Sequence, residues 1–143
     1  MVKIKVDFSY TIKIRNSFIK NKRTFALELK DNQKVVGSIG LEPRVEEACL
    51  SPALSGREVG YVLNKDYWGK GLMVEAVRAV IDYCFNVLDY DFFLCAHYLW
   101  NFQSHRVIEK CGFQFLLENK MINSLGNEEI RHLYVLYNPN KER

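Results

Sequence analysis

Two glycines stand one residue apart in the stretch DYWGKGLMVEA, residues 66–76, directly before a long amphipathic helical pattern. The N-terminus of a helix presents unpaired N–H groups and a partial positive charge of about 0.5 elementary units, and both attract anions. Gly69 and Gly71 remove side chains where a phosphate would touch the backbone. The spacing indicates a phosphate site, although glycines that serve only a tight turn between a strand and a helix give the same pattern.

Two familiar kinds of phosphate site are excluded by the residues around these glycines. The Walker pattern G-x-x-x-x-G-K-[ST] does not occur in the sequence. The dinucleotide fingerprint fails because its third glycine position is Val74. The loop is therefore expected to bind a phosphate ligand of another kind.

The spacing of apolar residues predicts the elements that position this loop. Alternation over 57–63 predicts a strand before the glycines, and apolar residues recurring every three or four positions predict a helix over 72–88. The same reasoning predicts further strands at 23–30, 34–41, 92–97, 113–119 and 130–137, a turn at 31–33, a loop at 42–56, and a helix at 101–111 that ends at Gly112. This order predicts an α+β fold in which helices pack on a mixed sheet.

Composition predicts a single soluble domain over residues 1–143. A chain of 143 residues with 48% hydrophobic content can bury one sizeable core. The net charge of +3, with both signs intermixed, gives no reason to expect nucleic acid or a membrane surface as a partner. No signal peptide or membrane-spanning run occurs, and no metal site is expected. A cytoplasmic location also fits the absence of a C-x-x-C pair among Cys49, Cys84, Cys95 and Cys111.

Two segments together carry a resemblance to a known family. GYVLNKDYWGKGLMVEAV (60–77) and NFQSHRVIEKCGF (101–113) resemble the GNAT acetyltransferases, in the RimJ/RimL-like branch of ribosomal-protein N-terminal acetyltransferases. The resemblance covers roughly residues 24–137. It implies the GNAT acyl-CoA N-acyltransferase fold, with a mostly antiparallel central sheet flanked by helices, and acetyl-CoA as cosubstrate.

The resemblance also implies which residues bind acetyl-CoA. In that family a loop of the form R/Q-x-x-G-x-G/A binds the pyrophosphate through backbone amides, and this sequence departs from it with Asp66 at the first position. The main chain of the preceding strand binds the pantetheine arm, and Gly60 either allows this approach or only relieves packing under an aromatic ring. The implied cofactor-binding residues are Tyr61, Val62, Leu63, Trp68, Gly69, Lys70, Gly71, Leu72, Met73 and Asn101.

Asn101 and Ser104 lie three residues apart on the second predicted helix and therefore share a face. By resemblance, Asn101 contacts the cofactor and Ser104 lies near its sulfur, although Asn101 is also a natural helix N-cap. Many GNAT enzymes place a tyrosine at the position of Ile108 to protonate the departing thiolate. Because that tyrosine is missing here, the acid role is assigned to Ser104.

Acetyl transfer needs a neutral amine, and the candidate bases are Glu58, Glu28 and His97. Glu58 is preferred because it lies on the strand that the resemblance assigns to the thioester, while a solvated glutamate at the sheet edge is the alternative. His97 is expected to be a structural histidine, and His105 and Arg106 are expected to face solvent. Candidate contacts for the nucleotide phosphates are Lys70, Arg106 and Lys110.

The opening of the chain departs from the branch. Its usual first strand, of the RLxLRPL kind, is not recognisable in the roughly 22 residues before the first predicted strand, so this region is expected to be shortened or missing. One wall of the acceptor site would then be incomplete, and pairing into a homodimer would cover exposed apolar surface.

The sequence therefore predicts an N-acetyltransferase that transfers acetyl from acetyl-CoA to a primary amine by direct attack in a ternary complex. The acceptor is a protein N-terminal α-amino group or a small amine. A non-catalytic acyl-CoA-binding or interaction module on the same scaffold is the main alternative. A nucleotide-binding α/β domain is a third, which antiparallel pairing of 34–41 with 57–63 would contradict.

Overall fold

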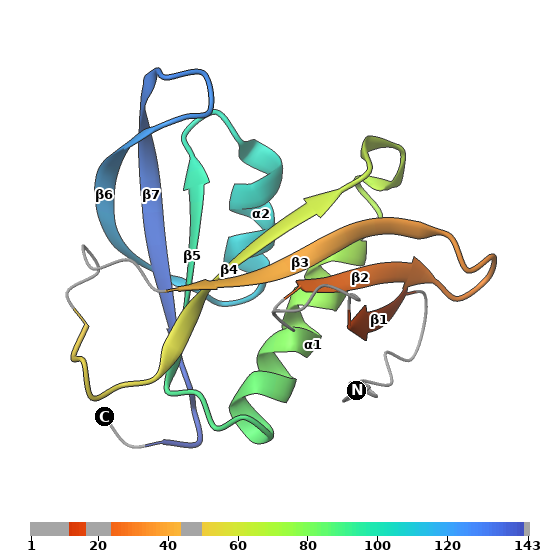
Figure 1. The fold of residues 1–143 in the computed structure, drawn as a ribbon, viewed down its shortest axis with the longest axis horizontal. Coiled ribbons are helices and arrows are strands. Elements are labelled where there is room, and N and C mark those ends of the chain that lie inside the picture. The colour runs from red at the N-terminus through yellow and green to blue at the C-terminus, as the bar shows by residue number, and fades with distance from the viewer. Residues whose placement is uncertain (1–11, 17–23, 44–49, 142–143) are drawn as a thin grey trace. The chain divides into compact units, whose positions relative to one another are not determined.

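The computed structural model describes residues 12–16, 24–43 and 50–141. The chain divides into two compact units, the first comprising Met1–Glu42 with Val59–Asp89 and the second Pro43–Glu58 with Tyr90–Arg143. Strand β4 (Gly56–Leu63), labelled in Figure 1, belongs to the second unit up to Glu58 and to the first unit from Val59. The single domain over 1–143 stays a prediction.

The first unit contains antiparallel strands and one long helix. Strand β1 (Ile12–Asn16) pairs antiparallel with β2 (Thr24–Leu29), which pairs antiparallel with β3 (Val35–Pro43). Strand β3 neighbours β4 and runs in the opposite direction, as the arrows in Figure 1 show, and the Asn64 N–H donates to the Val36 carbonyl at 2.7 Å. This antiparallel neighbour argues against the nucleotide-binding α/β alternative.

The predicted hairpin of this unit is confirmed, whereas β1 was not predicted. The turn between β2 and β3 closes through hydrogen bonds from the Leu29 N–H to the Lys34 carbonyl and from the Gln33 N–H to the Leu29 carbonyl, each 2.9 Å. The five-residue β1 is the first strand within the described residues. Its signal was the alternation of Ile12 and Ile14 with basic residues, which is too brief to predict a strand by itself.

Helix α1 (Leu72–Asn86) confirms the predicted amphipathic helix but ends two residues earlier than expected. The Val87 N–H closes the last turn on the Tyr83 carbonyl at 2.8 Å, and Leu88, assigned to the apolar face, is exposed. The residues that α1 buries follow the predicted three- and four-residue spacing and form much of the core of the first unit: Leu72, Met73, Ala76, Val77, Ala79, Val80, Ile81, Cys84 and Phe85.

The second unit contains the only parallel pairing among the described strands. Residues Gly56–Glu58 of β4 pair in parallel with β5 (Phe92–Tyr98), which pairs antiparallel with β7 (Glu128–Tyr137). Strand β7 also pairs antiparallel with β6 (Gln114–Ile122), and helix α2 (Phe102–Lys110) connects β5 to β6. The predicted α+β class, with a mixed and mostly antiparallel sheet, is thus confirmed.

The core of the second unit forms between β5 and β7. Phe92 and Leu94 pack with Leu133 and Val135, and all four are buried. Strand β5 is buried on both faces except toward its end, as its continuous apolar sequence predicts. The β6–β7 hairpin is longer than predicted because its outer part alternates polar and apolar residues on an exposed ladder.

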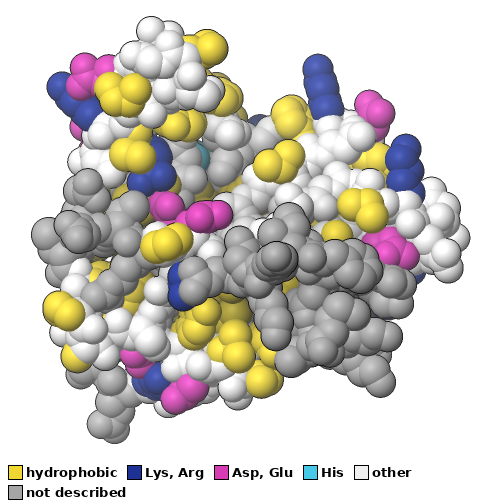
Figure 2. Space-filling view, viewed as in Figure 1, with side chains coloured by type: hydrophobic (Ala, Val, Ile, Leu, Met, Phe, Trp, Pro, Cys, Tyr) yellow, Lys and Arg dark blue, Asp and Glu magenta, His cyan; other side chains and the backbone are white. Residues whose placement is uncertain are grey.

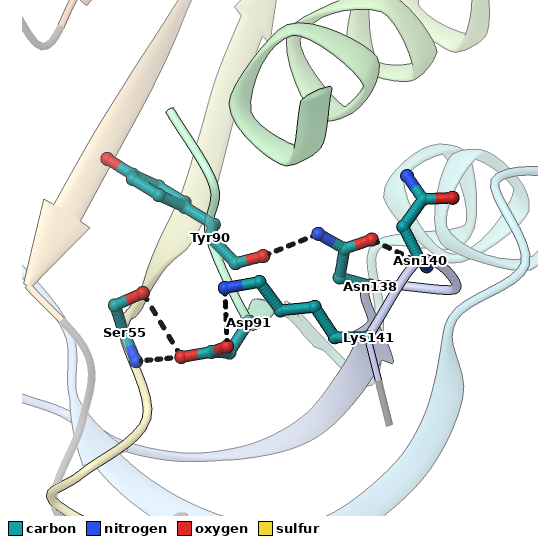
Figure 3. A network of polar contacts seen from close by, with 6 residues as sticks. All are labelled: Ser55, Tyr90, Asp91, Asn138, Asn140 and Lys141. Carbon is teal, nitrogen blue, oxygen red and sulfur yellow. Dashed lines mark hydrogen bonds and ion pairs between the residues drawn. The ribbon is translucent and has the colours of Figure 1, made fainter. Parts of the chain in front are cut away.

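A polar network ties the start of β5 to the segments beside it (Figure 3). The Asp91 carboxylate accepts hydrogen bonds from the Ser55 N–H at 2.7 Å and the Ser55 hydroxyl at 3.2 Å, and Lys141 Nζ lies 2.8 Å from its other oxygen. The hydrogen bond from Lys141, followed by that from Ser55, lowers the pKa of Asp91 below its ordinary value. Close by, Arg57 and Tyr90 help to line an open cavity of about 500 Å³.

The visible surface in Figure 2 carries acidic and basic side chains interspersed, in keeping with the modest net charge. Neither of the described α-helices has the length and apolar content needed to cross a bilayer.

Candidate functional site

The glycine loop lies in the first unit, between β4 and α1. A single 3₁₀ turn, η2 (Lys65–Tyr67), follows β4 and is capped by the Asn64 side chain, which accepts from the Asp66 N–H at 2.9 Å. The Trp68 indole N–H donates to the Leu63 carbonyl at 2.9 Å. Side-chain hydrogen bonds at both ends of the turn therefore hold the loop against the end of β4.

Both loop glycines adopt backbone conformations that other residues rarely adopt. Gly69 has φ +78° and Gly71 has φ +75°, and no described atom lies within 4 Å of the position of an added Cβ at either residue. Gly71 is the N-cap of α1 and forms no side-chain capping bond. The two glycines therefore do serve a tight turn between the strand and the helix. The same geometry presents a helix N-terminus whose partial positive charge suits an anion.

Two lysines approach the ring of Tyr67 in this loop region. Lys34 Nζ lies 5.7 Å and Lys70 Nζ 5.4 Å from the ring centroid, within the range of cation–π attraction. Within the described part of the chain, neither ammonium group has an acidic partner at ion-pair distance. Their positive charge adds to that of the helix terminus, which favours an anionic ligand.

The part of β4 around Gly60 is open to solvent rather than closely packed. No described atom lies within 4 Å of a Cβ added at Gly60, so the explanation that it relieves packing under an aromatic ring is wrong. Val62 has 69% of its surface exposed, while Tyr61 and Leu63 are half-buried. Close approach of a ligand to this strand stays a prediction.

Glu58 lies in the second unit and forms an ion pair that the sequence did not reveal. Its Oε1 lies 3.2 Å from Arg131 Nη1, and the two side chains are only 15% and 12% exposed. The alternative of a solvated edge glutamate is therefore wrong. The positive charge of Arg131 lies beside this carboxylate.

Asn101 caps α2, as the alternative explanation of this residue predicted. Its side-chain oxygen accepts from the Ser104 N–H at 3.1 Å, and Ser104 is half-buried on the first turn of the helix. A role of Asn101 in cofactor binding stays a prediction. Arg106 is exposed, as expected, and so is Lys110.

His97 is a buried structural histidine, as expected. Its Nδ1 donates to the Tyr98 carbonyl at 2.8 Å, so neutral His97 accepts through Nε2 from the Tyr134 hydroxyl at 3.1 Å. Burial lowers the pKa of His97, reinforced by the nearby His105 and His132, while burial raises the pKa of Tyr134.

His105 was expected to face solvent, and its side chain is only partly exposed, at 38%. Its ring stacks on that of His97 with centroids 4.7 Å apart, because the first turns of α2 pack on this face of β5. A charged partner, Glu109, lies 2.8 Å from its Nε2 one helical turn later. Glu28, the third candidate base, is buried on β2 in the first unit.

Comparison with known proteins identifies the family of this chain. Residues 7–114 match the model of the acetyltransferase (GNAT) domain family. The chain is 31% identical over 122 residues to the probable N-acetyltransferase YjcK of Bacillus subtilis. The aligned region covers 83% of this chain and 64% of that protein.

Two solved structures share the fold. The ribosomal-protein-S5-alanine acetyltransferase of Vibrio fischeri matches with a TM-score of 0.73 and 24% identity, over 84% of this chain and 63% of that one. RimJ of Mycobacterium smegmatis, in complex with CoA-disulfide, matches with a TM-score of 0.69 and 20% identity, over 82% and 54%. The chain thus spans less than two thirds of the length of each of these three proteins. The structural likeness shows the shared fold, and the match over residues 7–114 places the chain in the GNAT acetyltransferase family.

Proposed function

We propose that this chain is an N-acetyltransferase that transfers the acetyl group of acetyl-CoA to a primary amine. The acceptor is the α-amino group of a protein N-terminus or a small amine. The observation that carries the proposal is the loop before α1, where left-handed Gly69 and Gly71 open onto a helix start without a capping side chain. In a GNAT domain, such a loop suits the pyrophosphate of acetyl-CoA.

The proposed cofactor site continues from this loop in both directions along the chain. The backbone N–H groups of residues 69–73 face the pyrophosphate, with Trp68 and Lys70 beside them. The main chain of Tyr61, Val62 and Leu63 binds the pantetheine arm as an added strand would and polarises the thioester carbonyl. A backbone donor aimed at the developing oxyanion lowers the activation free energy by about 3 kcal/mol. Asn101 supplies a further contact to the cofactor.

The proposed chemistry is a direct attack. The amine lone pair forms a bond to the thioester carbonyl carbon, the C–S bond breaks, and coenzyme A leaves as a thiolate. Glu58 accepts the proton that the acceptor ammonium must lose, directly or through a water molecule. Ser104 donates a hydrogen bond to the leaving sulfur. The attacking nitrogen loses a second proton as the amide forms, and the thiolate takes up a proton, with solvent carrying it between them.

A non-catalytic acyl-CoA-binding module is the second candidate. It is favoured by one observation: Ile108 occupies the position at which many family members carry a catalytic tyrosine. This feature weakens acid catalysis without affecting the glycine loop.

One experiment separates these functions. The chain is incubated with acetyl-CoA and a panel of peptides, polyamines and small amines, while thiol release is followed and products are identified by mass spectrometry. Acetylated product supports the enzyme and identifies its acceptor. Calorimetric binding of acetyl-CoA without turnover supports the second candidate, and absence of binding contradicts both. A homodimer and a cytoplasmic location stay predictions, tested by light scattering and fractionation.

A further inference from the structure

Arg131 reaches the candidate base from a distant part of the sequence. It lies on β7, opposite Tyr98 of β5 in the strand register, while Glu58 lies on β4 opposite Leu94 of the same strand. Strand β5 therefore separates the two residues, and the long arginine side chain spans it to bring Nη1 within 3.2 Å of Glu58 Oε1.

The guanidinium group is oriented from a second side. Arg131 Nε donates to the Asn119 side-chain oxygen on β6, at 3.5 Å. Nη2 is buried and has no hydrogen-bond partner among the described residues. The arginine thus joins β6 to β4 but leaves one buried donor unsatisfied, which is unfavourable for the folded state.

Stability is a weak explanation for this arrangement. A largely buried ion pair gains little over a well-packed apolar pair of similar volume, because both ions must be removed from water. The contact between Arg131 Nη1 and Glu58 Oε1 is an ion pair without hydrogen-bond geometry, so it favours the ionised carboxylate through the nearby positive charge. That property is useful where the carboxylate takes part in a reaction.

We propose that Arg131 is a positioning residue, which holds the Glu58 carboxylate ionised and oriented toward the incoming ammonium group. This inference rests on the proposed acetyltransferase function. In the step concerned, an N–H bond of the ammonium breaks, an O–H bond forms on Glu58 or on an intervening water, and the nitrogen lone pair becomes available for attack. Arg131 itself transfers no proton.

Other charged or titratable groups of the second unit neighbour the pair in sequence or in strand register. Arg57 precedes Glu58 in the sequence, Tyr98 is the register partner of Arg131, and Glu129 lies two residues away on β7. Glu129 accepts from the Trp100 indole N–H at 3.3 Å. These groups remain in every variant below, so their effect on the pH profile is constant.

The test compares Arg131→Gln, which removes the charge, with Arg131→Lys, which keeps it but lacks the planar fork. Lys120→Gln is the matched control, since it breaks an exposed ion pair with Glu128, at 3.5 Å, on the same hairpin. The dependence of kcat/KM on pH is measured with one amine throughout. We expect Arg131→Gln to shift the acidic limb of the kcat/KM profile to higher pH, by about one pH unit. Arg131→Lys should move it less, and Lys120→Gln should leave it unchanged, with similar acetyl-CoA affinity in all variants.

An Arg131→Gln enzyme with an unmoved acidic limb and only a uniform loss of rate would overturn the inference. If Arg131→Gln does not fold, the double variant Glu58→Gln/Arg131→Gln removes the unpaired buried charge, and Arg131→Lys still tests the limb. Failure of the proposed function has a different signature, because the unmodified chain would then acetylate no amine.

Discussion

Glycine at positions 69 and 71 meets two requirements, a left-handed backbone and an open approach for a ligand. The first is a property of the folded chain, whereas the second matters only when a ligand binds. Gly126, in the turn of the β6–β7 hairpin, has φ +83° and equally open surroundings, but lies away from the loop in sequence. It therefore provides a reference for backbone strain alone.

Gly71→Ala should weaken both folding and acetyl-CoA binding. Strain at a left-handed residue costs about 1–2 kcal/mol of unfolding free energy, which urea titration measures. The added methyl group would also meet the bound pyrophosphate, so calorimetry should show reduced affinity. Gly126→Ala should lose similar stability with unchanged affinity. Equal affinity in a folded Gly71→Ala protein would contradict the loop assignment, and the larger Gly71→Val should show the same contrast more strongly.

Glu58→Gln should lower the maximal rate and alter the rising limb of the pH profile, because the amide cannot accept the proton. General-base catalysis contributes about 10²–10⁴-fold, and the activated thioester places the expected loss near the lower value. Acetyl-CoA affinity, measured by calorimetry, should hardly change. Ser104→Ala should lose less activity, since a thiolate leaves with little help. Full activity of Glu58→Gln at every pH would assign deprotonation to water or to another group.

At the scale of elements, prediction succeeded where the local pattern and the final environment agree. Helix α1 and strand β5 carry long apolar signals and become buried as those signals indicate. The 3₁₀ turn η2 was missed because it depends on a side-chain cap from Asn64. The irregularities in β2 and β6 depend on the partner strand, which the local sequence does not specify.

The cap of α2 offers a test of whether Asn101 has one role or two. Asn101→Ala removes the capping oxygen and should cost about 1 kcal/mol of unfolding free energy. Asn101→Asp retains that oxygen and should preserve stability. If the amide also contacts acetyl-CoA, Asn101→Asp should still weaken calorimetric binding, because its negative charge repels the cofactor phosphates. Unchanged affinity in a stable Asn101→Asp protein would limit this residue to its capping role.

At the scale of the whole chain, sequence separation decides which site residues can be predicted. The glycine loop is a contiguous motif, so its residues could be assigned before any fold was known. Arg131 and Glu58 are 73 positions apart, and their contact depends on the order and register of β4, β5 and β7. The contacts of His97 with His105 and Tyr134 depend on the same pairings and on the packing of α2. Unless those registers are known, the partners of His97 and Arg131 cannot be predicted from the sequence.

Burial of His97 makes the stability of the chain depend on pH in a definite direction. Its pKa is lowered in the folded state from the ordinary histidine value of about 6.5, chiefly by desolvation. Between those two values the unfolded chain binds more protons than the folded chain, so acid favours unfolding. The stabilisation is fully present above about pH 6.5 and is lost as the pH falls toward the lowered value. Asp91, whose pKa is lowered from 3.8, titrates well below this range and does not contribute.

Urea unfolding at closely spaced pH values from 8 to 5 would measure this dependence. The free energy of unfolding should be nearly level above pH 7 and should fall below about pH 6.5. His97→Gln retains polar contacts at this position but cannot titrate, so its stability should be lower at neutral pH and should decline less steeply with acid. Because His105 and His132 remain in that variant, the difference between the two slopes isolates His97. Equal slopes in both proteins would assign the acid sensitivity to those two histidines or to the carboxylates that pair with them.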